Sequence, residues 1–225
     1  MDRITIAIDG PAGAGKSTVA KEVAKRLGIS YIDTGAMYRG AAWLVVQHEV
    51  TASDEAAVVH LMDSHSLHFE ARDHGGFEVF ADGEPIAAQL RTPEVSDVVS
   101  QISALPKVRD LMTKWFREFS RRHSVVMDGR DIGTVVLPDA TVKIFLTADL
   151  DERTRRRAEE FDKKGYDVSW SQLKSDIEQR DARDSSREVA PLRPAADAHY
   201  IDSTGRSVSE VVQDILNVVE QVSYD

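Results

Sequence analysis

A glycine-rich segment near the start of the chain reads Gly10-Pro11-Ala12-Gly13-Ala14-Gly15-Lys16-Ser17-Thr18, with the spacing G-x-x-x-x-G-K-S. The apolar run Ile4–Ile8 precedes it, and Val19, Val23 and Leu27 follow at helical spacing. A strand, a glycine-rich turn and a helix in this order are typical of a phosphate-binding P-loop. The glycines let successive N–H groups turn toward phosphate oxygens, and the helix adds its positive dipole end.

Two positions in this segment and one farther along the chain predict a magnesium site. Lys16 brings a point charge to the outer phosphates, and Ser17 offers a hydroxyl to Mg²⁺. The apolar run Val125–Met127 ends at Asp128, which resembles a Walker B element whose carboxylate holds Mg²⁺ through water. Arg130 is expected to project into the same cleft. The alternative is an ordinary strand-end turn, in which Asp128 only favours the turn.

The bulk properties describe an ordinary globular chain of 225 residues, with 42% hydrophobic and 29% charged residues. Its net charge of −10 disfavours nucleic-acid binding, which needs a basic surface. The sequence has no cysteine, so it forms no disulfide and no thiolate metal site. No apolar stretch approaches membrane-spanning length, and no signal peptide is expected before the first strand. We expect a cytoplasmic protein that binds neither membranes nor nucleic acid.

Short apolar runs alternate with helical patterns, which predicts an α/β fold with a parallel sheet flanked by helices. The five expected strands are Ile4–Ile8, Ile29–Asp33, Val125–Met127, Val142–Leu146 and Tyr200–Ile201. In such a doubly wound sheet, ligands bind at the carboxyl ends of the strands.

Local signals refine this outline. Gly28 is placed to end the first helix. Three patterns predict further helix starts, namely Asp149-x-x-Glu152, Ser169-x-x-Gln172 and the capping box Ser207-x-x-Glu210.

Two regions interrupt the alternation. Residues 66–91 hold the strand-like pieces Ser66–Glu70 and Phe77–Ala81, with turn signals at 73–76 and 82–83, which predicts a small antiparallel sheet. Residues 150–187 hold two polar, arginine-rich helical segments joined by Lys163-Lys164-Gly165-Tyr166. Because these segments carry few large apolar residues, they predict a weakly anchored, mobile helical lid.

Arginines gather in this second region. Arg180, Arg183, Asp184 and Arg187 are spaced to share one helix face, where the arginines would repel one another unless an anion lies among them. Near a P-loop, this spacing predicts arginines that stabilise a transferring phosphoryl group. For Arg153, Arg156 and Arg157 a solvated face and phosphate contact remain equally good interpretations. The segment Asp33–Arg39 leaves two readings open as well, a helix cap with a solvated arginine or a second phosphate contact.

Four motifs together resemble one family, the bacterial cytidylate kinases among the P-loop nucleoside monophosphate kinases. They are Gly10–Thr18, Asp33-Thr34-Gly35-Ala36-x-Tyr38-Arg39, Asp128-Gly129-Arg130-Asp131-Ile132-Gly133-Thr134-Val135-Val136 and Arg180-Asp181-x-Arg183-Asp184-x-x-Arg187-x-x-Ala190-Pro191-Leu192. The resemblance spans nearly the whole chain, and its last three blocks are specific.

The resemblance implies a Mg²⁺-dependent transfer of the γ-phosphoryl group of ATP to CMP or dCMP. It implies a P-loop kinase core at about 1–62, 103–149 and 188–225, a nucleotide-monophosphate insert at about 63–102, and a lid at about 150–187. It implies catalytic roles for Lys16, Arg130, Arg180 and Arg187.

It further implies a binding site for the acceptor nucleotide. Arg39 and Arg130 match positions that hold the CMP phosphate. The pocket positions are Thr34, Tyr38, Ser100, Arg109 and Asp131, with Arg180 and Asp184 at the sugar and Arg187 at the base or phosphate side. We expect small-molecule partners and a monomer.

Two other classes compete with this reading. A small-molecule P-loop kinase, such as a shikimate kinase or a dephospho-CoA kinase, is disfavoured by the motif Asp128–Asp131 and by the insert at 63–102. A P-loop switch or ATPase that drives a partner is the other. A GTPase would need a guanine-reading N-K-x-D motif, which is absent from the sequence.

Overall fold

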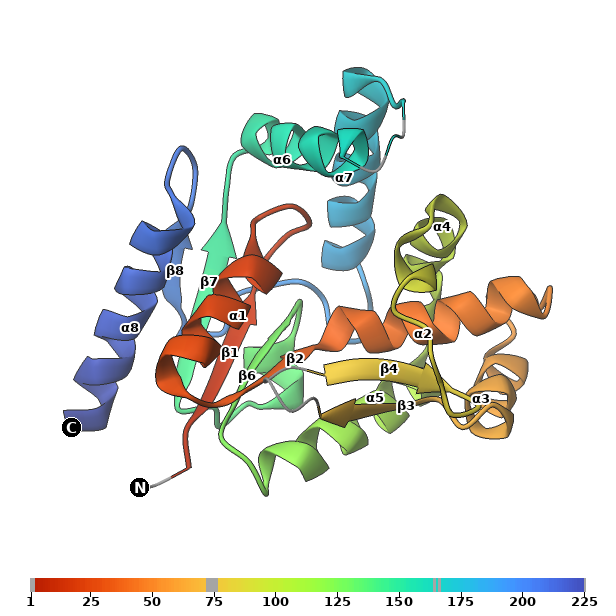
Figure 1. The fold of residues 1–225 in the computed structure, drawn as a ribbon, viewed down its shortest axis with the longest axis horizontal. Helices are drawn as coiled ribbons and strands as arrows, with labels where there is room; N and C mark the ends of the chain where they lie inside the picture. Colours follow the sequence, from red (N-terminus) through yellow and green to blue (C-terminus); the bar gives the residue numbers. More distant parts are fainter. Residues whose placement is uncertain (1–2, 72–76, 164, 166, 225) are drawn as a thin grey trace. The chain divides into compact units, whose positions relative to one another are not determined.

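The computed structural model describes residues 3–71, 77–163, 165 and 167–224. The chain divides into two compact units (Figure 1). The first comprises Met1–Gly28 and Val126–Asp225, and the second comprises Ile29–Val125. The finer predicted division into core, insert and lid stays a prediction.

A five-stranded parallel sheet has the order β2-β6-β1-β7-β8. Its strands are β1 (Thr5–Asp9), β2 (Ser30–Asp33), β6 (Val125–Gly129), β7 (Val142–Thr147) and β8 (His199–Asp202). The predicted five strands are therefore confirmed to within two residues at each end. They form because their apolar runs are buried without alternation, as the consecutive residues Ile6, Ala7 and Ile8 of β1 show.

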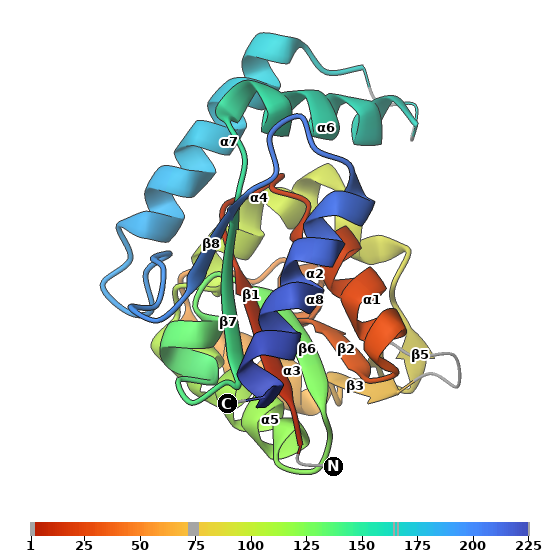
Figure 2. The same cartoon turned by 90° about the vertical axis from the view of Figure 1, so that its left-hand side faces the viewer.

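Helices cover the strands of the first unit. α1 (Lys16–Leu27) packs beside β1 and against α8 (Val208–Tyr224), which runs along β7 (Figure 2). The predicted capping box at the start of α8 is present, because the Ser207 N–H donates to Glu210 and the Glu210 N–H donates to Ser207 Oγ. Gly28 ends α1 in a left-handed conformation, as predicted.

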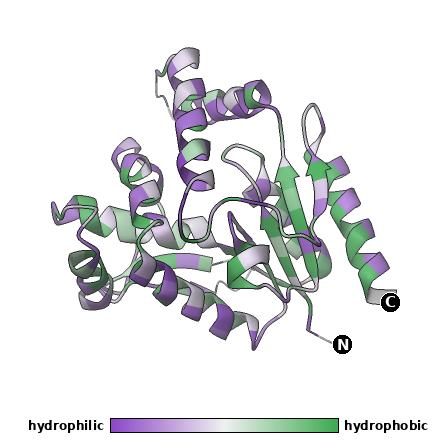
Figure 3. Cartoon of the chain, turned by 180° about the vertical axis from the view of Figure 1, so that it is seen from behind, coloured by the Kyte–Doolittle hydropathy of each residue, from purple (hydrophilic) through white to green (hydrophobic). Residues whose placement is uncertain are grey.

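α6 (Leu150–Asp162) and α7 (Trp170–Ser185) pack on each other as a helical hairpin, called here the α6–α7 hairpin. The predicted N-caps are confirmed: Asp149 accepts the Glu152 N–H, and Ser169 accepts the Gln172 N–H. The hairpin is mostly hydrophilic (Figure 3). In the predicted connecting turn, Lys164 and Tyr166 lie outside the described residues.

The second unit holds the helices α2 (Thr34–Gln47), α3 (Glu55–Ser64), α4 (Pro93–Ile102) and α5 (Pro106–Ser120), with the short η1 (Gln89–Arg91). The predicted small antiparallel sheet is confirmed as β3 (His68–Ala71), β4 (Phe77–Ala81) and β5 (Glu84–Pro85). Its 82–83 turn is also present, whereas the predicted 73–76 turn lies outside the described residues.

Gly10, the first residue after β1, is packed too tightly to accept a side chain. A Cβ atom on Gly10 would lie 1.9 Å from the Leu146 carbonyl oxygen, far inside contact distance. We expect Gly10→Ala to lower the free energy of unfolding by about 3 kcal/mol or more, because the strand end must shift. Urea denaturation measures this loss.

Gly28→Ala is the matched control. Its φ of 65° is also left-handed, but nothing lies within 4 Å of the added atom. We expect a loss of only about 1 kcal/mol from backbone strain. Equal losses in the two variants would contradict the contact-based explanation.

Candidate functional site

The P-loop carries Lys16 at the first position of α1, with its side chain buried. Its Nζ donates a hydrogen bond to the Pro11 carbonyl oxygen at 2.6 Å. Burial lowers the pKa of Lys16 well below its ordinary value, and the charges of Arg130 and Arg180 lower that pKa further, against Asp128 and Asp9. The lysine therefore lies among cations whose mutual repulsion an anionic ligand would relieve.

Ser17 and Asp128 meet as the sequence predicts. Ser17 Oγ donates to Asp128 Oδ2 at 2.8 Å, and the Asp128 carboxylate is buried at the end of β6. A hydroxyl and a carboxylate at this separation fit Mg²⁺, which usually takes one or two protein oxygens and completes its shell with phosphates and water. Among the described residues, no group of three or more His, Cys, Asp or Glu residues is placed to hold a metal. A magnesium ion here would accordingly depend on the phosphates of the ligand.

Asp184 is the anion among the arginines. It accepts hydrogen bonds from Arg130 Nε at 2.9 Å and from Arg187 Nη2, and its side chain is only 1% exposed. Burial alone would raise the pKa of Asp184, but Arg130, Arg187 and Arg180 together hold it below its usual value. The carboxylate is thus ionised and keeps the guanidinium groups of Arg130 and Arg187 in place.

The prediction of a single helix face is wrong for two members of this cluster. Arg183 is exposed, and its Nε donates to the Gln179 carbonyl of its own helix. Arg187 lies beyond α7, which ends at Ser185, and reaches Asp184 from the following turn. Helical spacing failed for Arg187 because α7 ends before the pattern does, whereas Arg183 lies within α7 but faces solvent.

Two of the three α6 arginines whose role the sequence left open, Arg153 and Arg156, bind the P-loop backbone. The third, Arg157, pairs instead with Glu160 of its own helix at 2.8 Å. Arg153 donates from Nη1 to the Ala12 carbonyl at 3.1 Å and from Nε to the Ala148 carbonyl at 3.0 Å. Arg156 donates from Nη1 to the Ala14 carbonyl at 3.2 Å and from Nη2 to the Ser203 carbonyl at 2.8 Å. Because carbonyls of the loop are held by arginines, the loop is fixed before any ligand arrives.

Asp181 connects α7 to the same loop. One carboxylate oxygen accepts the Ala12 N–H at 3.3 Å, and the other pairs with Arg153 Nη1. The Asp181 carboxylate therefore already accepts a hydrogen bond from one backbone amide of the P-loop, that of Ala12. The sequence motif contained Asp181, but nothing in its spacing indicated this contact.

Asp9, the last residue of β1, is a buried carboxylate that the sequence analysis missed. Its two oxygens accept the N–H groups of Ile132 and Gly133, each at 2.7 Å. Burial raises the pKa of Asp9 to about 7, and the charge of Asp131 raises it as well, while the two hydrogen bonds act in the opposite direction. An acid immediately before the first glycine was the available signal.

The second unit gathers another polar group at the start of α2. Asp33 caps this helix by accepting the Ala36 N–H at 2.9 Å, and its other oxygen pairs with Arg39 Nη2 at 2.9 Å. The predicted cap is therefore confirmed, but Arg39 pairs with Asp33 instead of being solvated, and its contact with a phosphate stays a prediction. Arg91, which the sequence analysis did not select, lies 3.8 Å from the same carboxylate.

Four further predicted residues of this unit are buried. Thr34 and Tyr38 lie on α2, Ser100 on α4 and Arg109 on α5. The Arg109 guanidinium lies 5.5 Å from the centre of the Tyr38 ring, and its Nη1 donates to the Ser103 carbonyl at 2.8 Å. A buried arginine over an aromatic face is a cation–π arrangement.

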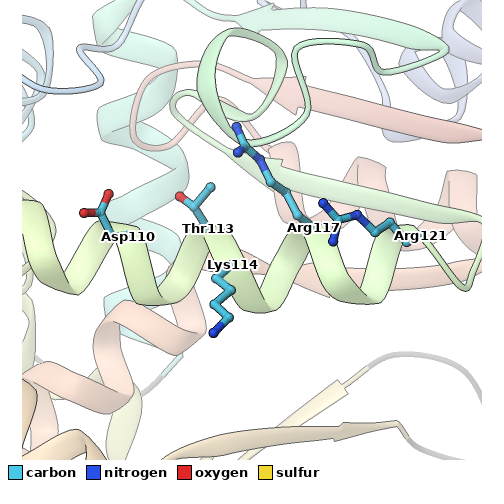
Figure 4. A pocket seen from close by; sticks show the side chains of 5 residues that line it. All are labelled: Asp110, Thr113, Lys114, Arg117 and Arg121. Carbon is cyan, nitrogen blue, oxygen red and sulfur yellow. The ribbon is translucent and has the colours of Figure 1, made fainter.

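A surface hollow on α5 contains none of the predicted residues. Its lining residues all come from this one helix and the residue that caps its C-terminal end, namely Asp110, Thr113, Lys114, Arg117 and Arg121 (Figure 4). One face of a single helix gives no enclosed chemistry, so the hollow is not the candidate site.

Comparison with known proteins shows which family the chain resembles over nearly its whole length. Residues 6–221 match the family described as cytidylate kinase. The chain is 50% identical over 216 residues to the cytidylate kinase of Lactiplantibacillus plantarum, covering 96% of this chain and 94% of that protein. It is 46% identical over 225 residues to the cytidylate kinase of Enterococcus faecalis, covering 100% and 99% of the two chains.

A solved structure shares the fold. An uncharacterized protein from Eubacterium ventriosum is similar with a TM-score of 0.54 at 14% sequence identity, covering 97% of this chain and 99% of that one. At this identity the likeness concerns the fold alone.

The Asp181 contact generates a binding prediction. Because its carboxylate competes for the Ala12 amide, Asp181→Asn should bind ATP about threefold to tenfold more tightly, as expected for removing a nearby like charge. Titration calorimetry without an acceptor measures the change. Asp151→Asn, which removes an exposed ion pair with Lys174 on the same hairpin, is the control and should leave ATP affinity unchanged. Weaker ATP binding by Asp181→Asn would mean that Asp181 shapes the loop instead of competing for it.

The raised pKa of Asp9 predicts a pH dependence of stability. Because the folded pKa of about 7 exceeds the ordinary value of 3.8, the folded state binds the proton more tightly than the unfolded state. This contribution is complete below pH 3.8 and is lost as the pH rises through 7; it amounts to about 4 kcal/mol at most. Urea denaturation from pH 4 to 8 should show this loss in the wild type relative to Asp9→Asn. Parallel stability profiles would contradict the burial of an ionisable Asp9.

Proposed function

The chain belongs to the cytidylate kinase family, and from this membership we propose that it transfers the γ-phosphoryl group of ATP to CMP or dCMP, giving ADP and CDP or dCDP. The observation that carries the proposal is the set of cations around Lys16. Arg130 and Arg180 both act on its pKa, and Arg130 is anchored by buried Asp184. A buried lysine with half-buried arginines beside it favours a ligand with several negative charges, which a nucleotide phosphate supplies.

The donor nucleotide binds the P-loop in this proposal. Its phosphates lie against the backbone N–H groups of the loop and against Lys16, which reaches the outer phosphates. Ser17 and Asp128 would hold Mg²⁺, the latter through water, and the ion would supply positive charge to the phosphates of the donor. The proposed donor residues are Gly10, Pro11, Ala12, Gly13, Ala14, Gly15, Lys16, Ser17 and Thr18.

The acceptor nucleotide is bound by guanidinium groups and by buried polar side chains. Arg39 and Arg130 hold its phosphate, because planar guanidinium groups bind phosphate oxygens in pairs. The proposed acceptor residues are Thr34, Tyr38, Arg39, Ser100, Arg109, Arg130, Asp131, Arg180, Asp184 and Arg187.

The chemistry follows from charge and position. Two anions must be aligned, and the attacking atom is already a phosphate oxygen, so no strong base is needed. Lys16, Arg130, Arg180 and Arg187 stabilise charge that spreads over the equatorial oxygens of the transferred group. Closure of the α6–α7 hairpin excludes water, which would otherwise accept the phosphoryl group.

The remaining predictions concern the membrane, the cellular location and the oligomeric state. Within the described part of the chain, no helix combines the length and apolar character needed to cross a bilayer. The cytoplasmic location, the monomeric state and the absence of nucleic-acid binding stay predictions.

An acceptor panel tests the function. CMP, dCMP, UMP, AMP and shikimate are supplied separately with ATP and Mg²⁺, and ADP release is measured. We expect CMP and dCMP to give the highest kcat/KM, and Lys16→Ala to lower phosphoryl transfer by about two orders of magnitude or more, because the loop then loses its charge on the outer phosphates.

The panel separates the competing classes. Dependence on shikimate would indicate a small-molecule kinase, and ADP release without any acceptor would indicate an ATPase or switch. Near-normal turnover by Lys16→Ala would contradict the proposed use of the P-loop.

A further inference from the structure

Asp9 links two segments that the proposed reaction requires to be aligned. It is the last residue of β1, so the P-loop begins with the next residue, Gly10. Its carboxylate accepts the N–H groups of Ile132 and Gly133 at 2.7 Å each, and these are the first two residues of the short helix η2 (Ile132–Val136). Both carboxylate oxygens therefore accept hydrogen bonds from the first two backbone amides of η2, which have no acceptor within the helix.

The segment held in this way carries the proposed acceptor residues. Arg130 and Asp131 directly precede η2, and Asp131 is buried. Their placement depends on where η2 starts, because only one peptide bond separates Asp131 from the first clamped residue. Asp9 itself would contact neither the donor nor the acceptor nucleotide, and it acts through Arg130 and Asp131.

The surroundings of Asp9 fit a rigid joint. A Cβ on Gly133 would meet Asp9 Oδ2 at 3.4 Å and Lys143 Cδ at 3.2 Å, so the start of η2 is packed between these two side chains. The Lys143 ammonium points to Asp197, which it meets at 2.8 Å. Of the charged groups near Asp9, Asp131 raises its pKa and Lys16 lowers it, whereas its hydrogen bonds at 2.7 Å come from the Ile132 and Gly133 N–H groups. The carboxylate thus serves the two amides.

We propose that Asp9 is a positioning residue, which fixes the acceptor-binding Arg130–Asp131 segment relative to the P-loop. The inference rests on the proposed function, since it assigns Asp9 a role in that same reaction. Alignment of two reactants is worth large factors in rate, and a displacement of about 1 Å costs about a hundredfold. The position of the segment should consequently affect the acceptor and the transfer step more than ATP binding.

Asp9→Asn tests the proposal, because it keeps the size of the side chain but turns an NH₂ group toward one of the two amides. We expect the KM for CMP to rise about tenfold and kcat to fall about tenfold or more, while the KM for ATP changes by less than about threefold. Hydrogen–deuterium exchange at Ile132 and Gly133 should accelerate at the same time, with little change in α8. Asp197→Asn is the control: it removes the partner of Lys143 on the other side of Gly133 and should leave both KM values unchanged.

The outcomes separate the two levels of inference. Equal changes in both KM values, or kinetic losses that only follow the unfolded fraction, would overturn the positioning role of Asp9. Unchanged exchange at Ile132 and Gly133 would overturn the clamp itself. If the wild type fails to phosphorylate CMP while exchange responds to Asp9→Asn, the proposed function fails and the clamp remains.

Discussion

The crowding of a buried lysine by half-buried arginines is the constraint around which the first unit is built. Burial lowers the pKa of Lys16, and the charges of Arg130 and Arg180 lower it further. Such a cluster is stable only when acceptors surround it. The protein supplies the Pro11 carbonyl to Lys16 and the Asp184 carboxylate to Arg130. The phosphates of a ligand can replace some of these acceptors. Binding then relieves the repulsion among the cations, which strengthens the affinity for the ligand.

A second layer of contacts keeps this arrangement rigid. Arg153 and Arg156 bind the carbonyls of the P-loop, which leaves its amides available on the other side, and Asp181 takes one amide in the absence of ligand. Asp9 holds η2. These residues share a feature: each charged side chain binds backbone of a distant segment, so loops that carry few apolar contacts are still fixed in position.

Prediction from the sequence succeeded where the signal is local. The apolar runs at Ile4–Ile8 and Val142–Leu146 became β1 and β7, because burial on both faces selects such runs. The caps at Asp149, Ser169 and Ser207 appeared where expected, because capping bonds join residues three apart. Ser17 and Asp128, which the sequence analysis assigned to one magnesium site, lie within hydrogen-bond distance, because the P-loop and Asp128 both follow carboxyl ends of parallel strands.

The amino-acid sequence by itself determined the glycine-rich loop, the positions of the five strands along the chain and the resemblance to a family. These features depend on residue types at fixed spacing. Only the tertiary structure decided what the charged side chains bind. Arg153 could have met solvent or phosphate but binds the Ala12 carbonyl, Arg183 left the cluster, and Asp9 emerged as a clamp on Ile132, which lies 123 positions away. A charge acts through space with the partners that the fold brings near, and spacing along the chain does not encode those partners.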